Sequence, residues 1–331
     1  MKKFFMFAAM ASVALASCVK NEPVATVEQG DAILFNSPVV APATKATTIA
    51  DAVAFPHTNF DAYAWYSATA FDAEDDATAY FSKKTFTDAG SYWSATQAYW
   101  PKNGVLSFVA YAPAAAVTDI ASSAEKLTFN YEVAAEMANQ KDLLYSDWVF
   151  NKTSEDQAGT NAFTETGIDL PFHHALSAVD FKLQAADADA ASLIKIKSIT
   201  LNAVKNTGTL TVLNTNVAEW SDVDGSAAYA VLANNDGAAN ATVITTTATD
   251  VSVDAEFMLM PQTTATTLSV AYYMNTEGGW IAQSTPVTLN LAWEKGTRYT
   301  YTIVFDLDEI KLAPVVKEAW ATSGADVPAV L

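Results

Sequence analysis

The sequence contains very little cysteine and little positive charge. Its 331 residues include a single cysteine, Cys18, so no disulfide can form within the chain and only the position of that residue is informative. Lys and Arg together number 18 against 37 Asp and Glu, which gives a formal net charge of -19. A negative field of this size repels phosphate backbones and therefore argues against a nucleic-acid partner.

Catalytic and metal-binding motifs are missing as well. The chain has no Gly-x-Ser-x-Gly, no phosphate-binding loop and no Cys-His nucleophile pair. His173 and His174 are adjacent on an expected strand, so their side chains point to opposite faces and cannot chelate one ion, which favours a structural role. The acidic run at 72–76 lacks the Gly and the terminal Glu of a calcium loop, which favours a solvated loop. We therefore predict that the protein is not an enzyme and holds no metal or cofactor.

The chain has one long apolar run, residues 4–16, directly after Lys2 and Lys3. The run is shorter than the roughly 20 residues of a membrane-spanning helix, and a positive start with a short apolar core is typical of a removable secretory signal. Its end, Leu15-Ala16-Ser17-Cys18, matches the lipobox at which the lipoprotein signal peptidase cuts before a lipid-bearing cysteine. We predict a signal peptide at 1–17 and a palmitate-type lipid on Cys18. An ordinary signal followed by a chance cysteine is the alternative.

Period-2 alternation of apolar and polar residues dominates the rest of the chain. It occurs in residues 127–133, 179–183, 251–259, 268–274, 287–293 and 299–307. Alternation places every second side chain on one face of a strand, and apolar strand faces must be covered by a second sheet. The pattern therefore predicts an all-β chain, with short helices at most within 47–55 and 185–194. The eight Trp and 13 Tyr fit the core of such a sandwich, and a sugar-stacking platform is the alternative.

Two polar stretches divide the chain. Residues 19–31 lack aromatic side chains and are typical of a flexible tether. Residues 151–167 lack strand patterning and are predicted to form a long loop, after which the alternation resumes. We therefore predict a domain boundary near residue 172.

Five short segments, in order along nearly the whole chain, carry a family resemblance. They are YWP with LSFVAYAP at 99–113, QKDLLYS at 140–146, FHHALSAVDF at 172–181, MLMPQ at 258–262 and WEKGTRYTY at 293–301. Together with the lipobox they resemble the Bacteroidetes fimbrillins, the major and accessory subunits of type V pili. The resemblance implies two transthyretin-like β-sandwich domains in tandem. Their expected bounds are 46–172 and 173–331, the second including a donor-strand tail, after a lipidated propeptide with the first strand at 18–45.

Polymerisation by strand exchange requires a removable strand, a cleavage site and a donor strand, and the chain has a candidate for each. The removable strand contains Ile33, Leu34, Phe35, Val39 and Val40. After small residues at 41–44 comes Lys45-Ala46, where the resemblance implies cleavage by a trypsin-like, Lys- or Arg-specific protease. The donor candidates are Val315, Val316, Trp320, Val330 and Leu331. A strand from the next subunit would refill the vacated groove, and such a head-to-tail contact does not close on itself, so it builds filaments.

The resemblance thus implies a structural fimbrial subunit for surface adhesion. Its expected partners are other fimbrial subunits, and its expected place is the cell outer membrane and then the surface fimbrium. Two other classes stay open, namely a monomeric glycan-binding surface lipoprotein and a secreted β-sandwich hydrolase. The position in a fimbrium (shaft, tip or anchor) is open too, although a tail beyond Trp320 favours a subunit that donates a strand.

Overall fold

The structure is a computed structural model that describes residues 31–40, 53–74, 77–90, 92–158, 167–251 and 256–320. The predicted signal peptide, Cys18, Lys45, Ala46, Val330 and Leu331 lie outside these described residues. Within them the strands form four sheets, accompanied by the short helical segments α1 (Ala188–Leu193), η2 (Met137–Asn139) and η3 (Asp156–Ala158). No helix in this part of the chain is long and apolar enough to span a bilayer. The predicted all-β fold is confirmed.

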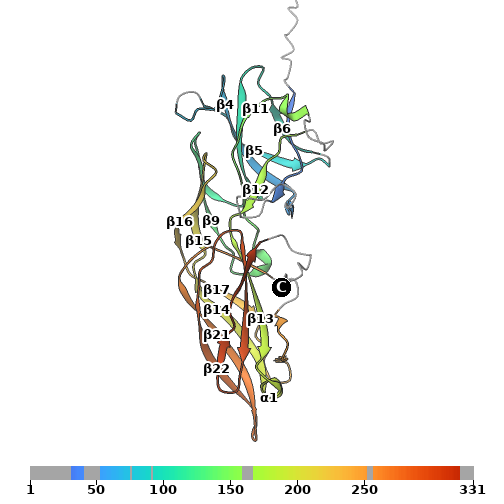
Figure 1. Cartoon of the computed structure of the whole chain (residues 1–331), viewed down its shortest axis with the longest axis vertical. Helices are drawn as coiled ribbons and strands as arrows, with labels where there is room; N and C mark the ends of the chain where they lie inside the picture. Colours follow the sequence, from blue (N-terminus) through green and yellow to red (C-terminus); the bar gives the residue numbers. More distant parts are fainter. Residues whose placement is uncertain are drawn as a thin grey trace, which may run out of the picture.

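A ten-stranded sheet occupies the N-terminal half, which is the blue-to-green upper part of Figure 1. Its strands are β1 (Ala32–Phe35), β2 (Val39–Val40), β3 (Val53–Ala54), β4 (Asn59–Ser67), β5 (Thr78–Asp88), β6 (Trp93–Tyr99), β7 (Val105–Ala112), β10 (Leu144–Ser146), β11 (Val149–Lys152) and β12 (Pro171–His174). The spatial order is β1-β6-β5-β4-β7-β10-β12-β2-β3, and β11 pairs with β7. Strand β7 is apolar on both faces because Val109 and Tyr111 pack into one core and Phe108 and Ala110 into another.

Two sheets pack together in the C-terminal half. One contains β13 (Ser177–Ala185), β19 (Thr249–Asp250), β20 (Phe257–Leu259), β23 (Thr297–Phe305), β24 (Ile310–Leu312) and β25 (Val316–Ala319). The other contains β14 (Ile194–Val204), β17 (Ala227–Leu232), β18 (Thr242–Val243), β21 (Ala265–Thr276) and β22 (Gly279–Asn290). The alternation works as predicted, since Val179, Phe181 and Leu183 enter the shared core while Asp180 and Lys182 between them do not.

The fourth sheet joins the two halves. It consists of β8 (Thr118–Ser122), β9 (Lys126–Glu132), β15 (Thr207–Leu213) and β16 (Ala218–Asp224), with Phe129 of β9 opposite Leu210 of β15. In Figure 1 it runs alongside the waist of the elongated molecule. The predicted boundary near residue 172 falls within β12 of the ten-stranded sheet, and the fourth sheet contains strands from both sides of it. The tandem transthyretin-like division, with domains at 46–172 and 173–331, stays a prediction.

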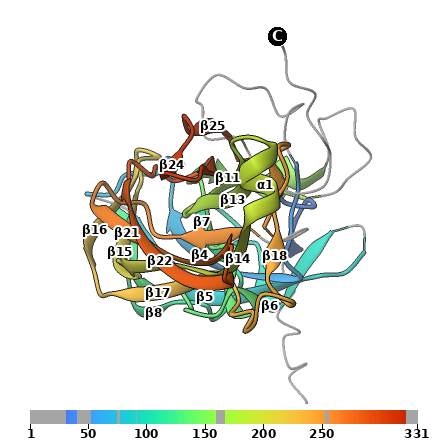
Figure 2. The ribbon, with the colours of Figure 1, turned by 90° about the horizontal axis from the view of Figure 1, so that it is seen from below.

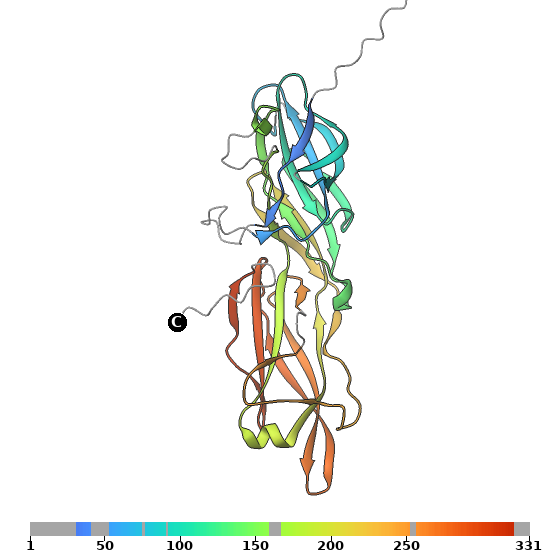
Figure 3. The same cartoon turned by 90° about the vertical axis from the view of Figure 1, so that its right-hand side faces the viewer.

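The ends of the C-terminal half are shaped by short local signals. The predicted helix within 185–194 is α1, and the Asp187 side chain caps it by accepting from the Ala190 amide at 2.8 Å. Figure 2 shows α1 beside β13, and in Figure 3 the orange β21–β22 hairpin extends beyond the helix. Elsewhere the expectations differ from the structure. Residues 151–152 belong to β11 rather than to a loop, and within 47–55 the two described residues before Phe55 form β3.

Candidate functional site

The N-terminal strand β1 is inserted at the edge of the ten-stranded sheet. It pairs antiparallel with β6, with Leu34 opposite Ser94 and Phe35 opposite Trp93. On its other side the Ile168 amide donates to the Leu34 carbonyl at 2.9 Å, and the Asn36 amide donates to the Ile168 carbonyl at 3.0 Å. Gly167 is required there because a Cβ atom would overlap Asn36 N. The strand is therefore hydrogen-bonded along both edges.

The Gln157 side chain completes the polar contacts of β1. Its Oε1 accepts from the Leu34 amide at 2.7 Å and from the Trp100 indole at 2.9 Å. Its Nε2 donates to the Ala32 carbonyl at 3.0 Å. A side chain thus substitutes for a neighbouring strand, and if β1 were removed these groups would lose their partners together.

The side chains of β1 fill an aromatic core. Ile33 and Phe35 are fully buried, and Leu34 between them is half-buried. The Phe35 ring meets Phe60, Phe86 and Phe108 edge-on at centroid distances of 5.5, 4.8 and 5.3 Å. Burial of each side chain contributes about 1.5–3 kcal/mol, and each edge-on aromatic pair adds roughly 0.5–1.5 kcal/mol. In the next short strand, β2, Val40 is buried, and both Val39 and Val40 pair in parallel with β12.

The C-terminal segment lies in the other half of the molecule, where it pairs with β23. Strand β25 pairs antiparallel with β23, with Glu318 opposite Arg298 and Val316 opposite Thr300. Val315 and Val316 are 41% and 57% exposed, so the predicted donor residues on this strand cover little apolar surface. The backbone ladder and a few specific side chains therefore hold the segment in place.

Trp320 is one of these side chains. It is 4% exposed, and its indole stacks on the His174 ring of β12 at a centroid distance of 3.9 Å and an interplanar angle of 13°. Its amide donates to the Gly296 carbonyl at 3.0 Å. His174 Nδ1 lies 2.8 Å from Asp142 Oδ1, whereas His173 on the opposite face pairs with Asp147 at 3.1 Å. Residues from the two predicted groups therefore both contact β12, namely Val39 and Val40 through β2 and Trp320 through His174.

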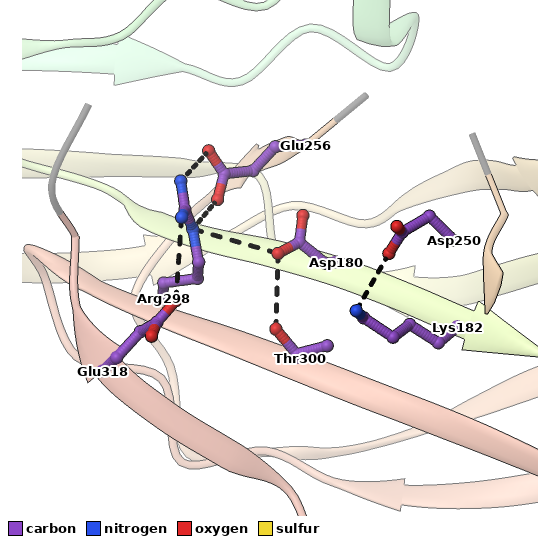
Figure 4. A network of polar contacts seen from close by, with 7 residues as sticks. All are labelled: Asp180, Lys182, Asp250, Glu256, Arg298, Thr300 and Glu318. Carbon is purple, nitrogen blue, oxygen red and sulfur yellow. Dashed lines mark hydrogen bonds and ion pairs between the residues drawn. The ribbon is translucent and has the colours of Figure 1, made fainter. Parts of the chain in front are cut away.

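A charged network centred on Arg298 holds the middle of β25 (Figure 4). The guanidinium makes a two-pronged contact with Glu256, and it lies 3.9 Å from Asp180 Oδ2 on β13 and 3.6 Å from Glu318 Oε1 on β25. Three carboxylates thus share one cation. Burial, reinforced by Glu256 and opposed by Arg298, raises the pKa of Asp180 to about 6. Asp180 and Arg298 both lie in segments that carry the family resemblance, but their contact was not predicted.

Among the described residues no group of three His, Asp or Glu side chains is arranged to hold a metal ion. The histidines instead make structural contacts, and burial lowers the pKa of His57, whose Nε2 lies 2.6 Å from the Asp142 carbonyl. The candidate site therefore consists of two strands, β1 and β25, each held by its own anchors.

Solved structures share this architecture. A fimbrial protein from Bacteroides vulgatus ATCC 8482 has a TM-score of 0.61 at 17% identity, covering 79% of this chain and 93% of its own. A candidate cell adhesion protein from Bacteroides ovatus ATCC 8483 has a TM-score of 0.51 at 14% identity, covering 89% of this chain and 99% of its own. At such identities the likeness shows the fold alone. A search among curated proteins found no match.

The fold is thus that of β-sandwich proteins of the bacterial surface, and the sequence defines the family. A profile of the fimbrillin-like family matches residues 44–320, so the chain belongs to this family. It is a fimbrial subunit with a structural rather than an enzymatic role. Its place is the cell-surface fimbrium, where it assembles with other fimbrial subunits.

Replacing Phe35 by Ala tests how strongly β1 is held. The variant loses the ring that three phenylalanines surround, and we expect the uncleaved protein to lose about 3–5 kcal/mol of unfolding free energy. Urea unfolding measures this, with Leu34→Ala as a control on the half-buried face of the same strand. Equal losses in the two variants would contradict the assigned role of Phe35.

Replacing Trp320 by Ala tests the anchor of β25. Without the stack on His174, we expect the amides of residues 316–319 to exchange with deuterium at least tenfold faster, since about 1.4 kcal/mol of local stability corresponds to that factor. Val316→Ala is the control because its side chain is mostly exposed. Unchanged exchange in the Trp320 variant would show that the backbone ladder alone holds the strand.

Replacing Asp180 by Asn tests the charged network through its pH dependence. The pKa of Asp180 is raised to about 6 in the folded state, so this carboxyl ionises at lower pH in the unfolded chain than in the folded protein. The protein therefore loses unfolding free energy as the pH rises from about 4 to about 7. We expect the Asn variant to gain stability relative to the parent protein over this interval. Thermal unfolding at a series of pH values measures the difference, and a pH-independent difference would refute the assignment.

Proposed function

We propose that this fimbrial subunit is exported as a lipoprotein through Cys18, cleaved after Lys45 by a trypsin-like protease, and polymerised by donor-strand exchange for surface adhesion. The observation that carries the proposal is the placement of β1. Its buried side chains, Ile33 and Phe35, lie on the N-terminal side of Lys45, so one cut there would separate them covalently from the domain that they fill.

Departure of the segment 18–45 would leave a site that demands a strand. The vacated groove would expose Phe60, Phe86 and Phe108 together with unpaired groups of β6 and Ile168. An unpaired edge beside an apolar groove is a template for another strand. A donor with apolar residues at alternating positions would restore both the ladder and the aromatic contacts.

The donor in this proposal is the C-terminal tail. Residues 321–331 follow the Trp320 anchor. Extended at about 3.3 Å per residue, they would span ~36 Å, which is longer than the strand β1 that they would replace. Val330 and Leu331 of this tail would supply apolar side chains. Pro328 has no amide hydrogen, so the ladder would be interrupted or at an edge at that residue.

Strand β12 would link cleavage to strand donation. Val39 and Val40, which the cut would release, pair with Pro171 and Phe172 of β12. Two residues further along, His174 carries the stack with Trp320. Loss of β2 would leave β12 paired on one edge, which would weaken the surface on which the C-terminal segment is anchored.

The test replaces Lys45 by Gln, which removes the cleavage point, and by Arg, which preserves it. After treatment with a Lys- and Arg-cleaving protease, we expect the parent protein and the Arg variant to give a product that starts at Ala46, followed by a polymer ladder in unheated gel samples. The Gln variant stays monomeric at full length.

A ladder from the Gln variant would contradict cleavage at Lys45. A monomer that keeps its lipid, stays uncleaved and binds glycans would instead support the rival interpretation, a monomeric glycan-binding surface lipoprotein. Mass spectrometry of the membrane-bound precursor tests the export step, since a diacylglycerol-modified Cys18 is expected at its N-terminus.

A further inference from the structure

A cleft of about 560 Å³ lies between the four-stranded sheet and the loops of the C-terminal half. It borders the β25 anchor, because its Lys295 directly precedes Gly296, whose carbonyl accepts from the Trp320 amide. Its volume falls within the roughly 300–1,000 Å³ of small-molecule sites. The residues that line it include Lys205, Glu219, Trp220, Gln262, Glu294 and Lys295. Strand exchange does not use these side chains.

The floor of the cleft is rigid. The backbones of Gln262 and Trp293 exchange two hydrogen bonds, at 3.1 and 2.9 Å. The buried Gln262 side chain accepts from the Lys205 amide at 3.2 Å and donates to the Lys205 carbonyl at 3.1 Å. Two of the segments that carry the family resemblance therefore meet here and are tied to the turn between β14 and β15.

Two ammonium groups line this cleft, and neither has a carboxylate within 4.0 Å in the part of the chain that the structure describes. Within the described residues, Lys295 has no ion-pair partner within 4.0 Å, and it is half-buried, so that desolvation lowers its pKa against a weaker opposing effect of Glu219. Lys205 Nζ donates to the Val223 carbonyl at 2.9 Å rather than to an acid. In a chain of net charge -19, two cations that line one cleft and contact no carboxylate favour a ligand with an anionic group.

An aromatic wall and an acidic rim narrow the choice of anion. The Trp220 indole donates to the Ala175 carbonyl at 2.7 Å, and the Cβ-free Gly208 packs against it, so the ring has a fixed orientation. Such a ring can pack against the apolar face of a sugar. The exposed carboxylates of Glu219 and Glu294 can accept hydrogen bonds from the hydroxyl groups of a sugar.

We propose that this cleft binds a carboxylated sugar residue, such as a hexuronic acid unit of a glycan. Its carboxylate lies against Lys295 and Lys205, its ring on Trp220, and its hydroxyls against Glu219 and Glu294. The inference adds a ligand-binding activity to the subunit role, and it does not depend on cleavage or on strand exchange.

The test uses the full uncleaved chain, so that failure of polymerisation does not affect it. Trigalacturonate and its neutral counterpart, a galactose trimer, are titrated by calorimetry against the parent protein. We expect binding of the acidic trimer at least tenfold tighter than that of the neutral one. Lys295→Met is expected to weaken binding of the acidic trimer at least tenfold, whereas the control Lys311→Met, at an exposed pair with Glu309, leaves it unchanged.

Trp220→Phe keeps an aromatic ring but loses the indole hydrogen bond, and we expect it to weaken binding of both trimers. If Lys295→Met does not fold, as judged by circular dichroism, Lys205→Met takes its place, with the same expected loss of binding of the acidic trimer. The absence of measurable binding of trigalacturonate, equal binding of the two trimers, or binding unaffected by Lys295→Met would each overturn the proposal.

Discussion

The central constraint in this molecule is that the N-terminal half cannot close its aromatic core without a strand supplied from one end of the chain. Phe35 stands among Phe60, Phe86 and Phe108, and the backbone around it satisfies Ile168 and part of β6. Apolar burial and the backbone ladder are both complete only while that strand is present. Without that strand, both the aromatic core and the backbone ladder of this half would be incomplete.

Strand β12 lies between the N-terminal segment and the C-terminal segment and contacts both. This short strand pairs with β2 on one edge and with β10 on the other, and the ring of its His174 stacks on the indole of Trp320. The four-stranded sheet of β8, β9, β15 and β16 adds a second connection between the halves. Strand β2 and Trp320 are therefore connected through the packed and hydrogen-bonded residues of β12.

Much of the fold was predictable because it depends on local periodicity. Alternation in 179–183 and 299–307 predicted two half-buried strands, and these became the parallel neighbours β13 and β23. The apolar residues of β1 were likewise recognised as a strand. In contrast, the pairing of β9 with β15, the network around Arg298 and the cleft beside Trp220 were not predicted, because each joins segments that are distant in the sequence.

By itself the sequence determined the class of fold, the family and the residues of the N-terminal strand, since alternation, composition and short motifs are properties of neighbouring residues. Only the tertiary structure decided that Phe35 closes an aromatic core, that Trp320 stacks on His174, and that Lys205 and Lys295 share a cleft. The physical reason is that strand register and partner choice follow from packing between remote segments.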